Sequence, residues 1–311
     1  MKSSIKIIFL LLLTTCAHGQ EAGEAIEGIS MQNQNSLPLD LPDQSTSKLN
    51  MYRNDSVQKE LLTKLKTNEK WRKLIAQKKM AIGVVDLRDP EQIKYAGIND
   101  NEMMYAASLP KIAVLLTAMD ALEKGEIEET PAIDEDLKLM ISRSDNAAST
   151  RMIDLLGYDK IASVLRDPQY ELYSEKYNGG LWVGKRYAKT GARKPDPILG
   201  LSHAATAYQV SRFYYLMVSG RLVSYERSKQ MLDIMEDPAL HHKFVHTLDQ
   251  IVPNARIFRK SGSWKNFHSD SVLVWDMSDR HYILVALIED PEGESIIRQL
   301  ILPVEEVLHI N

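Results

Sequence analysis

The sequence predicts an α+β fold, in which one five-stranded antiparallel sheet is flanked by helices and carries an inserted all-α lobe. Strand patterns bounded by turn residues occur in two groups, at 81–87, 92–96, 255–260, 271–276 and 282–289. Helical patterns fill the stretch between the two groups, about 108–236. Early and late strands with helices between them pair most simply in one sheet, with the helices as a second lobe.

Helices are also predicted at both ends of the folded part. Residues 55–79 have a charged helical pattern, and Asp55 or Ser56 can cap its start. Residues 293–309 form an apolar helix that is interrupted or kinked near Pro303.

We expect the folded domain to span 51–311, with the sheet lobe at about 51–105 and 250–311 and the helical lobe at about 106–249. A cleft between two lobes is where binding sites tend to form. Residues 20–50 are rich in Gln, Asn, Ser, Glu and Pro, which is typical of a disordered leader or tether.

The composition is that of a globular protein. Of the 311 residues, 44% are hydrophobic and 26% are charged. The formal net charge of −4 gives no basic footprint for nucleic acid or an anionic membrane surface. His241, His242 and His246 lack a metal-ligand spacing, so we expect surface histidines, no metal and no cofactor. The sequence leaves the oligomeric state open.

The first 19 residues are typical of a signal peptide. Lys2 and Lys6 precede an apolar run at 7–13, and the small residues Ala17 and Gly19 follow it. The run is too short to span a bilayer, and no later stretch has eighteen uninterrupted apolar residues. We therefore expect an exported protein without a transmembrane segment, either periplasmic or secreted.

Cys16 is the only cysteine of the chain. The segment Leu13-Thr14-Thr15-Cys16 loosely resembles a bacterial lipoprotein box, although Thr is a poor residue just before the cysteine. A lipid anchor at Cys16 and an ordinary signal-peptide cysteine therefore both stay open. If cleavage follows Gly19, the mature chain has neither disulfides nor thiol chemistry.

Ser108 and Lys111 form the first chemical motif, a Ser-x-x-Lys tetrad at the start of a buried helix that Gly125 ends. Residues three apart lie on one helix face, so the two side chains can meet, and a buried lysine can take the proton of an attacking serine. The same tetrad occurs by chance at 3–6, 45–48 and 56–59. Only the copy at Ser108 enters a buried helix.

The second motif is Ser144-Asp145-Asn146, which lies between helical patterns at 136–141 and 147–156. Its serine and amide can relay a proton and hold a substrate carbonyl. Because Ser, Asp and Asn also favour helix caps, a structural role is equally consistent with the motif.

The third motif is Lys260-Ser261-Gly262 at the end of the first late strand, followed by a loop. The rival Lys189-Thr190-Gly191 has the same pattern but no strand character, so we favour Lys260. Its lysine supplies positive charge for a carboxylate, and its glycine lets a substrate approach the strand edge.

These three motifs, in this order, resemble those of class A β-lactamases and penicillin-binding proteins. The segments Met140-Ile141-Ser142-Arg143 and Leu155-Leu156-Gly157 are similar to that family too, and the likeness covers about residues 80–289. The resemblance implies a β-lactamase/transpeptidase-like fold and a small β-lactam or acyl-peptide substrate.

The resemblance also implies a role for each matching residue. Ser108 forms the acyl-enzyme with Lys111 as its base partner, and Ser144 passes a proton to the leaving nitrogen. Asn146 binds the substrate amide, while Lys260 and Ser261 bind near the carboxylate. The backbone N–H groups of Ser108 and Ser263 form the oxyanion hole.

One family feature is absent. Class A enzymes carry a Glu-x-x-Leu-Asn segment whose glutamate activates the deacylating water, and no such pentapeptide occurs here. Glu171, Glu175 and Asp196 are possible substitutes, but we expect each to be a solvated charge. A missing water activator implies slow release of the acyl group.

Three functions therefore stay open: a class A β-lactamase-like hydrolase, a peptidoglycan D-alanyl peptidase or penicillin-binding relative, and a non-catalytic β-lactam sensor domain. The resemblance favours the first, and the missing glutamate favours the other two.

Overall fold

The computed structural model describes residues 36–39, 41 and 48–310. The predicted signal peptide, Cys16 and most of the predicted tether lie outside these residues. In the described part of that tether, Leu39, Leu41 and Leu49 have buried side chains, and Leu49 starts a short 3-10 helix, η1 (Leu49–Tyr52). No helix of the described part is long and apolar enough to cross a membrane.

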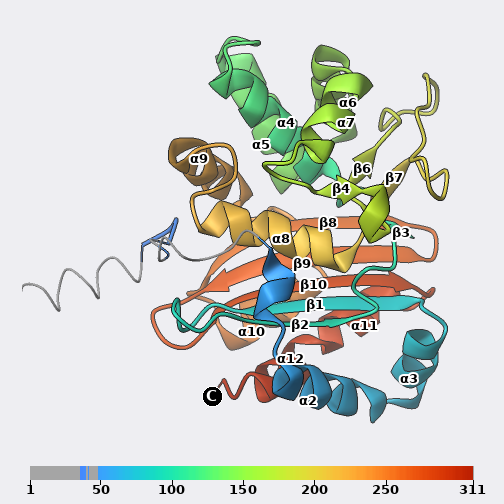
Figure 1. The fold of residues 1–311 in the computed structure, drawn as a ribbon, viewed down its shortest axis with the longest axis vertical. Coiled ribbons are helices and arrows are strands. Elements are labelled where there is room, and N and C mark those ends of the chain that lie inside the picture. The colour runs from blue at the N-terminus through green and yellow to red at the C-terminus, as the bar shows by residue number, and fades with distance from the viewer. Residues whose placement is uncertain (1–35, 40, 42–47, 311) are drawn as a thin grey trace, which may run out of the picture. The chain divides into compact units, whose positions relative to one another are not determined.

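The central element is the predicted five-stranded antiparallel sheet, and its strand order is β2-β1-β10-β9-β8 (Figure 1). Its strands are β1 (Met80–Asp86), β2 (Lys94–Ile98), β8 (Arg256–Trp264), β9 (Phe267–Trp275) and β10 (His281–Glu289). The early and late parts of the chain meet where β1 pairs with β10. This order leaves β8 at one edge of the sheet.

The β8–β9 hairpin is longer than predicted. A two-residue turn at Lys265-Asn266, in which Lys265 has a φ of 52°, lets the ladder continue to the pair Trp264–Phe267. The loop predicted after Lys260 is therefore wrong: Ser261, Gly262 and Ser263 are strand residues.

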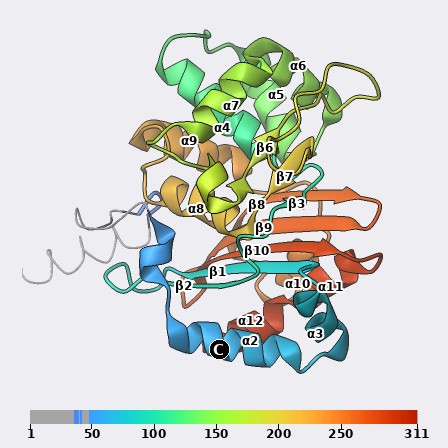
Figure 2. The same ribbon diagram turned by 45° about the vertical axis from the view of Figure 1, so that its right-hand side comes forward.

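The sheet is covered on both faces. Alternate strand residues such as Val85, Leu273 and Val285 belong to one core, together with α8 (Ala207–Val218) and α4 (Lys111–Glu123). The residues between them belong to a second core, which the helices near the two chain ends complete (Figure 2). Burial on both faces explains why β1 is buried at every position.

The end helices are each interrupted. The pattern predicted as one helix at 55–79 forms α2 (Asp55–Lys66) and α3 (Glu69–Ala76). The side chain of Asn54 caps α2 by accepting from the Val57 N–H at 3.1 Å, which corrects the expectation of a cap at Asp55 or Ser56. The last helix breaks at Leu300, just before Pro303, into α11 (Gly293–Gln299) and α12 (Ile301–Val307).

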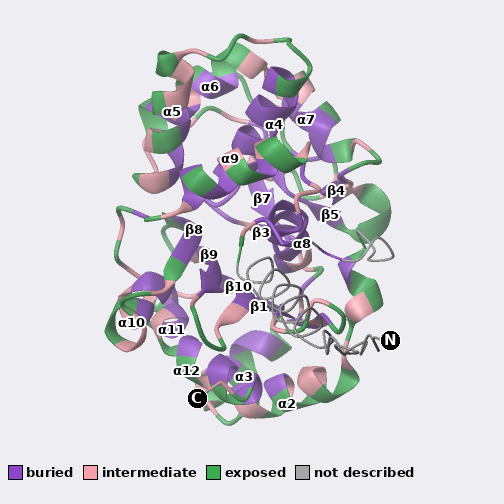
Figure 3. Cartoon of the chain, turned by 90° about the vertical axis from the view of Figure 1, so that its left-hand side faces the viewer, coloured by how far each residue is buried: buried purple, intermediate pink, exposed green. Residues whose placement is uncertain are grey.

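The remaining helices lie mostly on the α8 side of the sheet. They are α5 (Pro131–Ser142), α6 (Asn146–Leu156), α7 (Tyr158–Arg166), α9 (Tyr225–Met235) and, packed with α11, α10 (Phe244–Ile251). Helix α4 is central, because every residue from Lys111 to Leu122 is buried. In Figure 3 α8 is also buried along its length, and it packs directly on β1 and β10. The division into lobes at 106 and 249 stays a prediction.

Short strands that the sequence did not indicate connect the helices to the site. One small sheet consists of β3 (Met104–Tyr105), β6 (Trp182–Val183) and β7 (His203–Ala205). Another pairs β4 (Tyr173–Ser174) with β5 (Gly179–Gly180). A short 3-10 helix, η2 (Glu175–Tyr177), lies between β4 and β5 in the chain. The pairing of β3 with β7 holds the segment that leads to Ser108.

Candidate active site

A cavity of about 890 Å³ lies where the start of α4, the edge strand β8 and the loop after β6 meet. Three of the predicted site residues, Ser108, Asn146 and Ser263, line it. Lys111 and Lys260 are buried beside it and are connected to each other through Ser144. The structure therefore brings the three motifs to one place.

Ser108 lies in a tight turn just ahead of α4. Ala107 before it adopts a left-handed conformation, with a φ of 49°, which is uncommon for a residue with a side chain. The turn is held from two sides: Tyr187 donates to the Ala107 carbonyl at 3.2 Å, and Ser269 donates to the Ala106 carbonyl at 2.9 Å. These contacts fix the position of a half-buried hydroxyl on the cavity wall.

Lys111 is fully buried, and its ammonium points toward the second motif. Its Nζ donates to the Ser144 carbonyl at 2.6 Å and to the Asn146 Oδ1 at 2.9 Å. Burial lowers the pKa of Lys111 to about 7, against an opposing attraction from the Asp145 carboxylate. Within the described residues no hydrogen bond joins Lys111 to the Ser108 hydroxyl, so the predicted direct contact is not formed. A lysine with this pKa is partly neutral at neutral pH and is able to accept a proton.

The residues of the Ser144-Asp145-Asn146 motif make different contacts. Asp145 caps α6, because its carboxylate accepts from the Ala148 N–H at 2.6 Å. Ser144 has a φ of 56°, and its hydroxyl accepts from Lys260 at 2.9 Å and from Lys111 at 3.4 Å. The capping role that the sequence left open thus belongs to Asp145. The side chains of Ser144 and Asn146 instead accept hydrogen bonds from the lysines.

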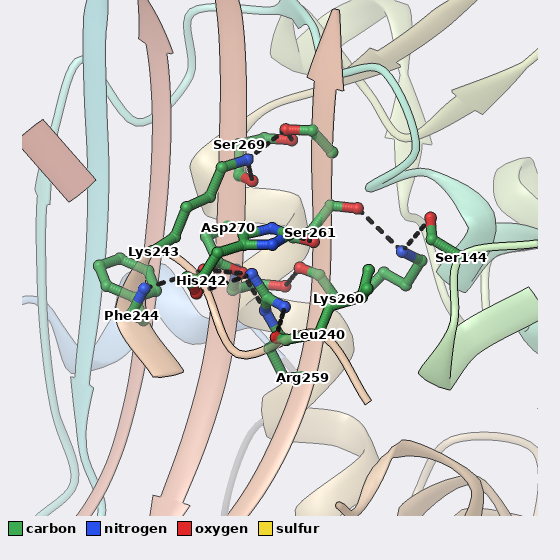
Figure 4. A network of polar contacts seen from close by, with 12 residues as sticks. Ser144, Leu240, His242, Lys243, Phe244, Arg259, Lys260, Ser261, Ser269 and Asp270 are labelled. Carbon is green, nitrogen blue, oxygen red and sulfur yellow. Dashed lines mark hydrogen bonds and ion pairs between the residues drawn. The ribbon is translucent and has the colours of Figure 1, made fainter. Parts of the chain in front are cut away.

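Lys260 reaches from β8 toward Ser144 (Figure 4). Its Nζ donates to the Ser144 hydroxyl at 2.9 Å and to the Ser261 carbonyl at 2.8 Å. Burial, and then the charge of Lys111, hold the pKa of Lys260 well below its usual range. The rival Lys189 is exposed in a loop, as its lack of strand character predicted.

Gly262 lies against the turn that carries Ser108. A Cβ at this position would lie 2.6 Å from the Ser108 nitrogen and 2.7 Å from the Leu109 nitrogen, and it would also meet the Ala106 carbonyl. The glycine is therefore needed for the approach of this turn to β8, whereas the sequence suggested an approach of the substrate.

Replacing Gly262 with alanine is expected to displace the Ser108 turn and slow acylation by on the order of 10²-fold, since misplacing a reactive group by about an ångström has that effect. The control is Gly97→Ala on β2, at the other edge of the sheet, where the atoms nearest to a Cβ belong to the Asp100 side chain, at 2.5 Å. Adduct formation followed by mass, alongside thermal unfolding, separates the two. Equal acylation by both variants would contradict the positional role.

Behind β8 lies a polar network that sequence reasoning missed. The buried Lys243 donates to the carbonyls of Gly262 at 2.6 Å and Ser269 at 2.9 Å, which joins β8 to β9 beside the Ser108 turn. Burial lowers its pKa to about 8. Arg259 and Asp270 form a buried ion pair at 2.7 Å, shown in Figure 4. Charge inside apolar strands was a signal for Arg259 and Asp270, whereas Lys243 precedes α10 and had no such signal.

His242 belongs to the same region. It lies 3.4 Å from the Ser261 hydroxyl through its Nε2, and burial lowers its pKa to about 4. The expectation of a plain surface histidine is therefore wrong at this position, because the ring is partly buried beside the site. The part of the chain that the structure describes has no cluster of ligands for a metal ion.

No acid lies at the cavity among the described residues that line it. Asp196, expected to be a solvated charge, is buried, and it accepts from the backbone N–H groups of Ile198 at 2.9 Å and Leu199 at 3.0 Å. It therefore shapes its own loop. Glu175 is exposed and paired with Arg166, as a solvated charge would be.

This sheet, the buried central helix and the clustered Ser, Lys and Asn side chains form the arrangement expected of the β-lactamase and penicillin-binding-protein class. The model of the Beta-lactamase enzyme family matches residues 66–136 and 130–302, and the chain belongs to this family. No curated protein matches the sequence.

Solved structures of the same fold are similar over most of their length. A beta-lactamase from Sphaerobacter thermophilus is 18% identical, covers 82% of this chain and 95% of its own, and has a TM-score of 0.60. PBP-A is 17% identical over 83% of this chain and 97% of its own, with a TM-score of 0.60. A representative of class A beta-lactamase from Bacteroides cellulosilyticus is 16% identical, covers 83% of this chain and 100% of its own, and has a TM-score of 0.61. At these identities the likeness shows the fold alone.

Proposed function

We propose that this protein opens β-lactam or related amides through an acyl-Ser108 intermediate. The observation that carries the proposal is the arrangement of a hydroxyl on the cavity wall, a buried lysine with a pKa of about 7 three residues later, and a second hydroxyl between two lysines. These groups can transfer one proton from the nucleophile, Ser108, to the leaving group of the substrate.

In the acylation step the Ser108 oxygen attacks the amide carbon, and its proton passes to neutral Lys111. Lys111 lies 3.4 Å from the Ser144 hydroxyl, through which the proton reaches the leaving nitrogen as the C–N bond breaks. The N–H groups of Ser108 and Ser263 stabilise the oxyanion. Asn146 binds the substrate amide, and Ser261, with Lys260 beside it, binds the carboxylate.

We propose that release of the acyl group is slow. The described lining of the cavity holds no carboxylate to activate a water. Losing about 4 kcal/mol of barrier lowering slows a step roughly a thousandfold. The second candidate, a penicillin-binding or D-alanyl peptidase relative, shares all the chemistry up to this point. A PBP-A mutant among the structural neighbours was solved as an acyl-enzyme complex with penicillin G.

Intact-mass spectrometry after brief and long exposure to a penicillin tests both proposals. We expect a one-to-one adduct that persists after free penicillin is removed, and no adduct in Ser108→Ala. The matched control is Ser202→Ala, which alters another serine of the cavity wall and is expected to keep the adduct. Rapid clearance would refute slow release, and no adduct with any β-lactam would refute the hydrolase.

We further propose that the chain is exported, from the apolar run at 7–13 and the small residues after it. A mature protein beginning at Gln20 is expected in the periplasmic or secreted fraction. A lipid on Cys16 would instead place the protein in the membrane fraction. If the protein recovered from cells still begins at Met1, export with cleavage is refuted.

A further inference from the structure

Positive charge is concentrated around the cavity, on the loop after β6 and at the turn between β8 and β9. Five basic residues line the cavity: Lys185, Arg186, Lys189, Arg193 and Lys265. No acid lines it within the described residues. Because the whole chain has a formal net charge of −4, this local excess is opposite in sign to that of the molecule.

Most of this charge is not neutralised by the protein. Among the described residues Lys185, Lys189 and Lys265 form no ion pair, and Arg193 donates only to the Gly200 carbonyl, at 2.5 Å. Arg186 is the exception, since it pairs with Asp154. Cations left unpaired around a cavity attract an anionic ligand.

The loop that carries four of these residues is held in place. Lys185 and Arg193 form an antiparallel bridge, and the Lys194 N–H donates to the Gly184 carbonyl at 2.7 Å. The Tyr187 hydroxyl ties the loop to the carbonyl of Ala107, next to the nucleophile. The cations are therefore positioned relative to Ser108 and do not hang from a free segment.

We propose that the substrate of this site carries at least two anionic groups. One lies at the Lys260–Ser261 end, which rests on the proposed function. The second lies on the far side of the scissile bond, among Lys185, Lys189 and Lys265. The ligand is a small acyl compound with a second carboxylate, because these cations line the same cavity as Ser108.

Two peptides that differ by one carboxylate test this: N-acetyl-D-Ala-D-Ala and N-succinyl-D-Ala-D-Ala. Binding is measured to full-length Ser108→Ala, so that no acylation is required. Trp264 lines the cavity and is 58% exposed, which makes its fluorescence a suitable readout. We expect the succinyl peptide to bind about tenfold more tightly at low ionic strength, and the preference to shrink in about 0.5 M salt.

The triple variant Lys185→Gln/Lys189→Gln/Lys265→Gln is expected to reduce this preference to about twofold or less. The charge-matched control is the triple variant Lys59→Gln/Lys66→Gln/Lys229→Gln, which removes three exposed lysines of α2 and α9 outside the cavity lining and should leave the preference unchanged. Three outcomes would each overturn the proposal. They are equal affinities of the two peptides for Ser108→Ala, an unchanged preference in the triple variant of the cavity lysines, and no saturable binding of either peptide. If the Ser108→Ala variant prefers the succinyl peptide while the protein with Ser108 forms no adduct with any β-lactam, this inference is sustained and the proposed function is refuted.

Discussion

Replacing Lys111 with methionine is expected to lower the rate constant for acylation of Ser108 by about 10²–10⁴-fold, the usual worth of a positioned general base. Methionine keeps the length and apolar body of a side chain that is fully buried. It removes the amine that donates to Ser144 and Asn146. The measurement is the second-order rate constant of adduct formation with a penicillin.

The pH profile makes this prediction specific to proton transfer. Burial lowers the pKa of Lys111 to about 7, so its neutral, basic form increases as the pH rises through that value. Acylation by the parent should therefore increase with pH and reach half its maximum near pH 7. In Lys111→Met this inflection should disappear, while Lys138→Met, an exposed lysine on α5, should retain both rate and profile. An unchanged rate in Lys111→Met would transfer the role of base to another group.

Local patterns predicted the sheet and the central helix well, because both depend on apolar residues at regular spacing. They could not divide the roles within Ser144-Asp145-Asn146, since all three residue types favour caps. The structure separates them through the conformation of Ser144, whose φ is 56°, and the bond from Asp145 to the Ala148 N–H.

What the sequence could not predict depends on register between distant segments. Opposite Gly262 on β9 is Ser269, and the buried Lys243 reaches the carbonyls of both. Nothing local marks Lys243 as a support for the nucleophile's turn. The acid-free cavity is a similar case, because the basic loop at 185–193 was visible in the sequence but its place beside Ser108 was not.

Removing the carboxylate of Asp270 is expected to destabilise the fold by about 3–5 kcal/mol, the cost of leaving a buried charge without its partner. Asp270 is fully buried, and it holds Arg259 through two hydrogen bonds of 2.7 and 2.9 Å. It also accepts from the Phe244 N–H at the start of α10. In Asp270→Ala the buried cations Arg259, Lys243 and Lys260 would lose the attraction of this anion.

The control is an ion pair of Arg256, which lies on β8 like Arg259. Arg256 on β8 pairs with Glu236, but both side chains are partly exposed, at 42% and 31%, so Glu236→Ala should cost only about 0–1 kcal/mol. Urea unfolding measures both free energies. An apolar double replacement, Arg259→Met/Asp270→Leu, should recover much of the loss, because burying no charge is cheaper than burying one alone. If it recovers stability but not acylation, the ion pair serves to place β8 beside Ser108. A cost for Asp270→Ala as small as the roughly 0–1 kcal/mol expected for Glu236→Ala would contradict a stabilising role of the buried pair.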